Sequence, residues 1–506
     1  MTTRTARGLL VLVVLAYIAL FCQFSPLLVQ DYPNHLARAT VMADLLFRHG
    51  AGFGQSFRLH LMWIPYVSGD LVLTSLVEVA GTKAAAVIWG LLTFLSLPAA
   101  VYVYLRARRA STEVTLLMLF ISLYLSTDTF FVMGFFEFRL SIALVLVTLA
   151  AVEWLREQWS GARFAIFAAL IALTYLTHLA AIVFIGAAVG VSAVWRIALG
   201  KSRIDREIYL LIPIIGVLAW HFVEAVTYRQ PGDVVGNESY WGTVTSKVDH
   251  LSWDLVRYHR QRDSVVMATL LAFLLFYLSG RRIRSREAIV TPQVLEPLAY
   301  AALFLGLYVA LPHEQTEAAF VDVRALTLVP FFGVFGLLNL PPSTAPPASR
   351  LNTLAICLAA AVACANLGYL AFYFHRESGW LAQYRAIVAG IPPQSTVLPV
   401  LTEKKTGNLL KHLHAASFAV MDRHALIPYL FSGDNGNPMK YFRYVHRPYA
   451  PDELWYLARW DREVDWAQVS QQYQYLLIVK PFTADRIHLK VHTVAENDAA
   501  ALLAVE

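Results

Sequence analysis

The residues best suited to chemistry gather where the first apolar run ends, in residues 30–38. Asp31 opens this stretch, and His35 and Arg38 follow it three residues apart. A carboxylate at such a position can accept a proton from a hydroxyl group. It can equally serve only as the N-cap of the helix that should begin there. The residues alone leave both uses of Asp31 open.

Two further carboxylates, Asp128 and Glu137, stand among aromatic residues in the stretch 126–139. This stretch separates two apolar runs, so we expect both acids at the edge of a membrane. They are candidates to line a site with Asp31. The alternative is an interfacial loop in which Glu137 simply pairs with Arg139.

Arginine side chains suited to phosphate occur at two later places. Arg257 and Arg260 belong to a basic cluster at residues 257–262, and Arg324 begins an apolar run. The planar guanidinium presents a fork of donors that matches phosphate oxygens. The alternatives are a solvated helix end near anionic lipid for the cluster and an Arg324–Asp322 ion pair.

His178 lies in a tight connection between two apolar runs. A lone histidine in such a place is usually a structural residue. Polar groups at the depth of a membrane are nevertheless costly and often functional. His178 is therefore a candidate site-lining residue.

The composition indicates that these residues belong to a membrane protein. Of 506 residues, 58% are hydrophobic and 15% are charged. A soluble globular protein carries about a quarter charged residues, so the ordinary soluble enzyme is excluded. The apolar content also excludes disorder. The net charge of +6 is expected from basic cytoplasmic loops, and we infer no nucleic-acid partner.

Eleven apolar runs are long enough to suggest membrane-spanning helices. They lie at residues 8–29, 84–105, 112–127, 138–155, 163–177, 179–198, 207–227, 264–280, 295–312, 322–340 and 351–374. Basic residues cluster between them at Arg106, Arg108, Arg109, Arg156, Arg163, Lys201, Arg203, Arg206, Arg281, Arg282, Arg284 and Arg286. Such clusters mark the cytoplasmic side. All these clusters can lie on one side only if the stretch 61–81 lies at the membrane interface and does not cross the membrane.

The sequence thus predicts a polytopic all-α membrane protein with about eleven transmembrane helices and a cytoplasmic N-terminus. Interfacial helices are expected in the first outer loop, where a helix should start near Asp31 and stop at Gly50. Its apolar residues Leu36, Ala39 and Ala43 recur at helical spacing and are expected to lie on the bilayer surface.

The tail differs in composition from the rest of the chain. Strand-like runs at residues 395–401 and 473–479 alternate with helical stretches, and residues 434–438 suggest a turn. We therefore divide the chain into a transmembrane domain, residues 1–374, and a small extracytoplasmic α/β domain, residues 375–506. A packing or partner-binding role is the simplest interpretation of this second domain.

A carboxylate just past the first span, a following amphipathic helix, many spans and an outer C-terminal domain together resemble the GT-C superfamily. These are integral-membrane glycosyltransferases that use polyprenyl-phosphate-linked sugars. The resemblance implies that Asp31 binds or deprotonates the acceptor, with His35, Arg38, Asp128, Glu137 and His178 lining the site. It implies that Arg257, Arg260 and Arg324 hold the donor phosphate. It also suggests that Asp31 and Asp128 share a divalent cation, Mg²⁺ or Mn²⁺, through oxygen ligands.

The leading functional hypothesis is therefore transfer of a sugar from a polyprenyl-phosphate-linked donor, reached through membrane lipid, to an extracytoplasmic glycan, lipid or protein. The expected location is a bacterial inner membrane with the C-terminal domain in the periplasm. One alternative is a lipid or glycolipid transporter or flippase, although ionisable residues are rare in the middle of the runs. Another is a non-catalytic membrane assembly protein. No nucleotide-binding motif supports ATP-driven transport.

Overall fold

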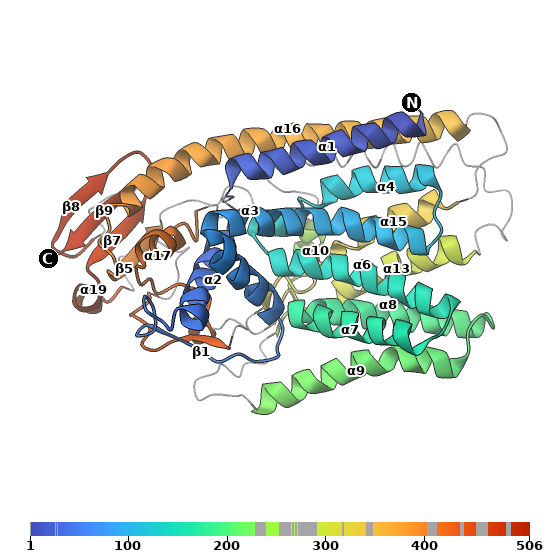
Figure 1. The fold of residues 1–506 in the computed structure, drawn as a ribbon, viewed down its shortest axis with the longest axis horizontal. Helices are drawn as coiled ribbons and strands as arrows, with labels where there is room; N and C mark the ends of the chain where they lie inside the picture. The colour runs from blue at the N-terminus through green and yellow to red at the C-terminus, as the bar shows by residue number, and fades with distance from the viewer. Residues whose placement is uncertain are drawn as a thin grey trace.

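The computed structural model describes residues 2–25, 27, 29–227, 239–251, 265, 268, 271, 291–315, 318–340, 348–401, 412–435, 440–451, 464–481 and 487–506. Long helices lie side by side in a bundle, and a small domain with a sheet sits at one end of it (Figure 1). The N-terminus lies toward the end of the bundle that is farther from this domain (Figure 1).

Eight helical segments are long and apolar enough to cross a membrane. The bundle helices are α1 (Thr3–Phe24), α3 (Val67–Ala107), α4 (Thr112–Leu125), α6 (Phe136–Glu157), α7 (Gly161–Thr177), α8 (Leu179–Ala198), α9 (Ile204–Thr227), α13 (Pro292–Ala310), α14 (Val323–Leu326), α15 (Val329–Leu338) and α16 (Ala348–Val388). Of these, α7 and the segment containing α14 and α15 are shorter apolar helices. The predicted run 264–280 lies mostly outside the described residues, and the count of eleven spans is not confirmed.

Smaller elements complete the described chain. They are α2 (Tyr32–Phe47), β1 (Phe57–Leu59), α5 (Thr129–Met133), β2 (Ser239–Tyr240), α10 (Val244–His250), β3 (Glu314–Gln315), β4 (Ala318–Ala319), β5 (Val397–Leu401), α17 (Ser417–Arg423), β6 (Phe442–Tyr444), α19 (Trp466–Gln472), β7 (Tyr475–Val479), β8 (Val491–Glu496) and β9 (Ala500–Val505).

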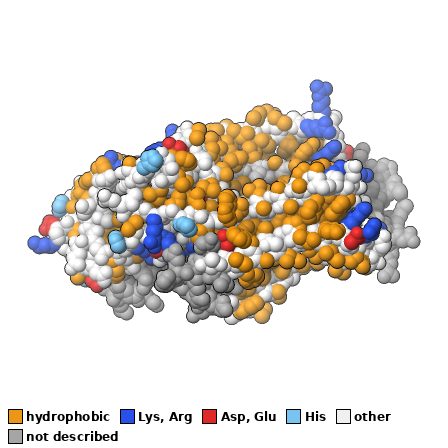
Figure 2. Space-filling model, turned by 60° about the horizontal axis from the view of Figure 1, so that its bottom comes forward, with side chains coloured by type: hydrophobic (Ala, Val, Ile, Leu, Met, Phe, Trp, Pro, Cys, Tyr) orange, Lys and Arg blue, Asp and Glu red, His pale blue; other side chains and the backbone are white. Residues whose placement is uncertain are grey.

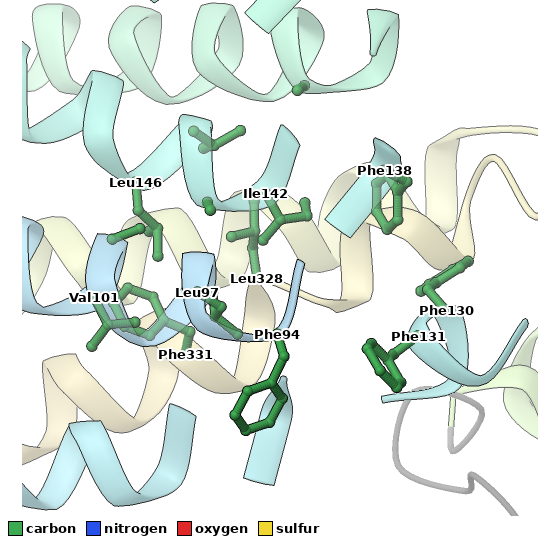
Figure 3. Packing of buried hydrophobic residues seen from close by; sticks show 14 of the residues in the cluster. Phe94, Leu97, Val101, Phe130, Phe131, Phe138, Ile142, Leu146, Leu328 and Phe331 are labelled. Carbon is green, nitrogen blue, oxygen red and sulfur yellow. The ribbon is translucent and has the colours of Figure 1, made fainter. Parts of the chain in front are cut away.

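The outside of the bundle is largely apolar. On the face that Figure 2 shows, hydrophobic side chains cover most of the bundle, and charged side chains lie mainly toward its ends. Val194 and Phe222 are each 71% exposed, for example. Inside, aromatic and aliphatic side chains from α3, α6, α15 and the segment before α15 pack together (Figure 3). An apolar surface of this kind is matched by lipid tails.

A buried ionic cluster lies at the end of the bundle where α3, α6 and α8 terminate. Glu296 of α13 lies 2.5 Å from Arg108 and 3.0 Å from Arg196. Arg156 binds Glu207 at 2.6 Å, and Glu153 contacts all three arginines. Two arginines that were predicted to share one side of the membrane, Arg108 and Arg156, therefore meet at one end of the bundle and pair with glutamates.

Helix α3 is interrupted at Gly81, which divides it into two parts. A straight helix of 41 residues would be about 60 Å long, about twice the thickness of the hydrocarbon core. Gly81 interrupts it with a φ of +79°, a left-handed conformation that glycine adopts without steric cost. The part before the break runs along α2, since Arg38 pairs with Asp70 and Arg48 with Glu78. The stretch predicted not to cross is thus packed against α2.

Helix α2 begins after Asp31, as predicted, but its environment differs from the prediction. Leu36, Ala39 and Ala43 are at most 1% exposed and belong to the protein core. Its other side faces the C-terminal domain, where Ala37 and Val41 join a second core. The apolar stripe of α2 was expected on the bilayer surface; it packs against protein because helices cover it on both sides.

The C-terminal domain contains a four-stranded sheet in the order β5-β7-β9-β8. Strand β5 pairs parallel with β7, and the other pairs are antiparallel. The two predicted strands are confirmed as β5 and β7. Helix α16 runs without interruption through the predicted domain boundary at residue 375 and ends at Val388.

The first outer loop and the C-terminal domain are joined by backbone pairing. Strand β1 of the loop pairs antiparallel with β6 of the domain, with Phe57 opposite Tyr444. Phe57 also stacks on Phe442 with ring centroids 5.1 Å apart. The two regions share one apolar core and therefore pack as one unit.

Candidate functional site

Asp31 is held in place by its backbone. Its N–H donates to the carbonyl of Met133 at 3.0 Å, and the N–H of Gln30 donates to Val132 at 3.2 Å. Gly134 ends α5 with a φ of +84°, and a Cβ there would lie 2.7 Å from the backbone nitrogen of Tyr32. Only glycine allows this approach. The chain after α1 is therefore fixed against α5.

The carboxylate of Asp31 is not used as a helix cap. Asp31 occupies the N-cap position of α2, yet within the described structure its side chain accepts no capping hydrogen bond. It is 7% exposed. Burial raises its pKa to about 7; the nearby Glu137 adds to this, whereas His35 and Gln30 oppose it. A carboxyl group that titrates near neutral pH is well matched to accept a proton.

The C-terminal domain reaches Asp31 through His414. The Nε2 of His414 lies 3.6 Å from Oδ1 of Asp31. Its Nδ1 lies 3.1 Å from the amide nitrogen of Asn34. Asn34 in turn donates to the carbonyl of Tyr429 at 2.8 Å and accepts from the N–H of Phe431 at 2.9 Å. The first turn of α2 is thereby tied to the outer domain.

One helical turn further on, α2 carries a buried charged cluster. Arg38 donates to both carboxylate oxygens of Asp70, at 2.9 and 2.5 Å, and Tyr441 donates to the same carboxylate. Arg38 also lies 3.0 Å from Nδ1 of His35, which is 3.3 Å from Oε1 of Glu137. Three segments that are distant in sequence thus converge beside Asp31.

Two buried polar atoms of this cluster have no hydrogen-bond partner among the described residues. They are Nη1 of Arg38 and Oε1 of Glu137, the second of which lies 3.3 Å from Nδ1 of His35. The tight fit of Glu137 requires Gly69, because a Cβ at that position would lie 2.6 Å from Cγ of Glu137. Buried polar atoms are normally hydrogen-bonded. A hydroxyl-rich ligand could provide what these two atoms lack.

Asp128 makes two structural contacts. It caps α5 by accepting from the N–H of Phe131 at 3.0 Å, and it forms a buried ion pair with Arg139. The suggested pairing of Glu137 with Arg139 is therefore wrong. Asp128 and Arg139 instead border a small cavity between α3, α4, α6 and the start of α15.

The described residues do not fit a divalent cation well. Asp128 is already neutralised by Arg139, so a cation shared with Asp31 stays a prediction. Donor atoms of His35, Asp70 and Glu137 lie within 4.8 Å of one another. However, the guanidinium of Arg38 already binds two members of that group. The positive charge there is supplied by arginine.

A second group contains Arg324 and His178. Nη1 of Arg324 lies 3.1 Å from Nε2 of His178, and the hydroxyl of Tyr66 lies 3.2 Å from the same nitrogen. The guanidinium packs over the rings of Phe135 and Phe138. Burial and the charge of Arg324 lower the pKa of His178. His178 is therefore neutral beside the cation.

Arg324 is a buried cation without a carboxylate partner among the described residues. It is 8% exposed and its Nε has no hydrogen-bond acceptor there. The suggested pair with Asp322 is wrong, because Asp322 binds His313 at 2.9 Å and Lys247 at 3.1 Å. An unpaired buried charge is costly. A buried guanidinium of this kind is suited to binding an anion.

The two groups are neighbours. Glu137 belongs to the first, and the adjacent Phe138 packs on His178 at 5.2 Å. Tyr66 and Asp70, one turn apart, contact His178 and Arg38 respectively. Asp31, His35, Arg38, Glu137, His178 and Arg324 thus lie around one region, whereas Asp128 faces Arg139. Arg257 and Arg260 lie outside the described residues.

Sequence reasoning missed Asn34, Asp70, His414 and Tyr441. Asp70 could have been predicted as a paired residue, because an acidic residue in an otherwise apolar stretch needs a partner. The indication for Asn34 was weaker, as a polar residue in the first turn of α2. His414 and Tyr441 lie in the tail, and no local pattern links them to Asp31.

The chain has the fold of a protein of known crystal structure. The crystal structure of ArnT from Cupriavidus metallidurans in the apo state matches with a TM-score of 0.57 and 13% identity, covering 99% of this chain and 98% of that one. ArnT bound to undecaprenyl phosphate matches with a TM-score of 0.55 and 13% identity, covering 100% and 98%. The predicted fold, a polytopic helical membrane protein with a small C-terminal domain, is confirmed by this likeness over the whole chain. No family model and no curated protein matches the sequence.

Proposed function

We propose that this chain is a membrane glycosyltransferase that moves a sugar from a polyprenyl-phosphate-linked donor to a hydroxyl-bearing acceptor. The observation that carries the proposal is the buried, uncapped carboxylate of Asp31, whose pKa is raised to about 7 by burial. It lies near buried polar atoms of Arg38 and Glu137 that have no hydrogen bond within the described part of the chain. The full-length likeness to ArnT adds support.

In the proposed reaction, the acceptor oxygen attacks the anomeric carbon and its proton passes to Asp31. The bond between that carbon and the phosphate oxygen breaks, and polyprenyl phosphate leaves with the electron pair. The leaving group is polyprenyl phosphate, whose negative charge is shared among the phosphate oxygens. It therefore needs no strong general acid to protonate it. This distinguishes the site from that of a glycosidase, which uses two carboxylates at the cleaved bond. Inversion at the anomeric carbon is the expected outcome.

Arg324 is the proposed partner of the donor phosphate. It is buried and unpaired with any described carboxylate, and a phosphate oxygen would satisfy its donors. The match to ArnT bound to undecaprenyl phosphate supports a lipid of this class. Arg257 and Arg260 remain candidates for the same role. The acceptor is a glycan, a lipid or a protein, and a divalent cation remains a proposal.

We place the site on the outer face of a bacterial inner membrane. Asp31 and the C-terminal domain lie at one end of the bundle, because Asn34 contacts Tyr429 and Phe431. The arginines that α3, α6 and α8 carry at their ends lie at the opposite end. Basic residues favour the cytoplasmic side, so the site and the C-terminal domain would face the periplasm.

The decisive experiment compares the wild type with Asp31→Asn in proteoliposomes. We expect the wild type to transfer a sugar from a polyprenyl-phosphate donor to an acceptor in a membrane extract. Loss of a general base should lower this rate at least about 100-fold, while binding of undecaprenyl phosphate is retained. Asp422→Asn, which alters a surface ion pair with Arg385, serves as the matched control and should be fully active.

The same experiment separates the enzyme from the alternatives. A flippase would move labelled lipid between leaflets without forming a glycosylated product, and it would tolerate Asp31→Asn. An assembly protein would show neither transfer nor lipid movement. Either result would refute the proposal.

A further inference from the structure

We propose that His414, a residue of the C-terminal domain, is a positioning residue for the carboxylate of Asp31. The catalytic centre would then be completed by a side chain from outside the transmembrane helices. This inference rests on the proposed function, since it assigns Asp31 the role of base. It concerns how that base is held in place.

The hydrogen-bond network determines which nitrogen of His414 carries the proton. The N–H of Phe431 donates to Oδ1 of Asn34 at 2.9 Å, which identifies the other amide atom as the nitrogen. That nitrogen donates to the carbonyl of Tyr429 at 2.8 Å and lies 3.1 Å from Nδ1 of His414. Nδ1 must therefore accept. A neutral imidazole has one acceptor and one donor, so the proton is on Nε2.

The protonated nitrogen faces the base. Nε2 of His414 lies 3.6 Å from Oδ1 of Asp31. This separation exceeds that of a hydrogen bond, but catalytic hydrogen bonds in the absence of substrate are often long and shorten when substrate binds. The imidazole is neutral, because burial lowers the pKa of His414 to about 3. It therefore acts as a dipolar donor and not as a counter-ion.

His414 is rigidly placed. It is 8% exposed, and its ring packs edge-on against Phe431 with centroids 4.8 Å apart. Phe431 also contacts His35 at 5.4 Å. The segment that carries His414 leads directly into α17, which contacts α2. A donor held in this way can fix the orientation of a carboxylate that makes no cap bond.

The test compares His414→Phe with His414→Gln. Phenylalanine keeps an aromatic ring against Phe431 but removes both nitrogens, whereas the amide of glutamine can present an N–H to Asp31. We expect His414→Phe to lower kcat about 10- to 100-fold and to leave the KM for donor lipid nearly unchanged. A small fall in Tm is expected as well, because the amide of Asn34 loses an acceptor. His414→Gln should recover most of kcat. Equal kcat in the wild type and His414→Phe, or equal losses in both variants, would overturn the proposal.

A second readout does not depend on transfer. At acidic pH the infrared spectrum should contain a carboxylic acid C=O band that Asp31→Asn removes. A donor from His414 lowers the frequency of this band, so His414→Phe should raise it and His414→Gln should largely restore it. An unchanged band in His414→Phe refutes the positioning role even if transfer is observed. A shifted band without any transfer supports the positioning role and refutes the proposed function.

Discussion

Arg38 and Asp70 form an ion pair in which neither side chain is exposed to solvent. It joins α2 to the first part of α3, and Tyr441 of the C-terminal domain donates to the same carboxylate. Three regions of the chain are therefore fixed by one buried charge pair, about two helical turns away from the candidate base.

Removing one partner of this pair should destabilise the protein strongly. Asp70→Asn leaves the guanidinium of Arg38 buried without a counter-charge, which costs about 3–5 kcal/mol. We expect a clear fall in Tm in detergent, measured by thermal unfolding. Asp205→Asn, which alters the exposed pair with Arg203, should leave Tm unchanged. Equal Tm values for the two variants would show that the buried pair does not hold these segments together.

The rate of transfer should depend on the protonation of Asp31. Because its pKa is raised to about 7, the base is protonated below this pH, and kcat/KM should rise with pH through neutrality. Glu137 contributes to the raised pKa of Asp31. Glu137→Gln should therefore move the acid limb to lower pH, whatever its effect on the maximal rate. The measurement is a pH profile of kcat/KM, and a limb that moves upward contradicts the assignment.

Arg324→Ala should separate lipid binding from stability. Loss of charge-assisted hydrogen bonds to phosphate weakens binding by about 1.5–3 kcal/mol, or about 10- to 100-fold in Kd. The variant removes a buried cation that has no described carboxylate partner, so Tm should fall less than in Asp70→Asn, although packing on Phe135 and Phe138 is lost. Binding of undecaprenyl phosphate, followed by tryptophan fluorescence, tests this. Arg385→Ala, at the surface, is the control. A fall in Tm with unchanged binding would make Arg324 a structural residue.

Gly134→Ala should displace the base. The left-handed backbone at this position costs about 1–2 kcal/mol for an alanine, and the added Cβ would meet the backbone nitrogens of Asp31 and Tyr32 at 2.9 and 2.7 Å. We expect a lower Tm and a large loss of transfer. Gly216→Ala in α9, where nothing lies within 4 Å, should be neutral in both assays. Full activity of Gly134→Ala would show that the backbone contact does not position Asp31.

Local patterns in the sequence were sufficient for the helices and for two strands of the tail. Apolar runs of about 20 residues became bundle helices, and the start of α2 at Asp31 followed from helix-capping chemistry. The environment of α2 could not be predicted in this way. An apolar stripe packs equally well against lipid or protein, and only the polar residues on its other faces, Asn34 and Arg38, indicated that it is enclosed.

Pairing between charges was harder to predict because it depends on geometry over longer distances. Glu137 and Arg139 are close in sequence, but both lie in α6, where residues two apart point in different directions. Each instead pairs with another segment, Glu137 with His35 and Arg139 with Asp128. The partners of Asp31 in the tail could be found only from the folded chain.

The pairing of β1 with β6 has a consequence for biosynthesis. A ribosome delivers β1 long before β6 has been synthesised. Until then β1 lacks its strand partner, and Asn34 and Asp70 lack the contacts that Tyr429, Phe431 and Tyr441 make. The residues around Asp31 therefore cannot adopt the arrangement described above until the segment that carries β6 has been synthesised.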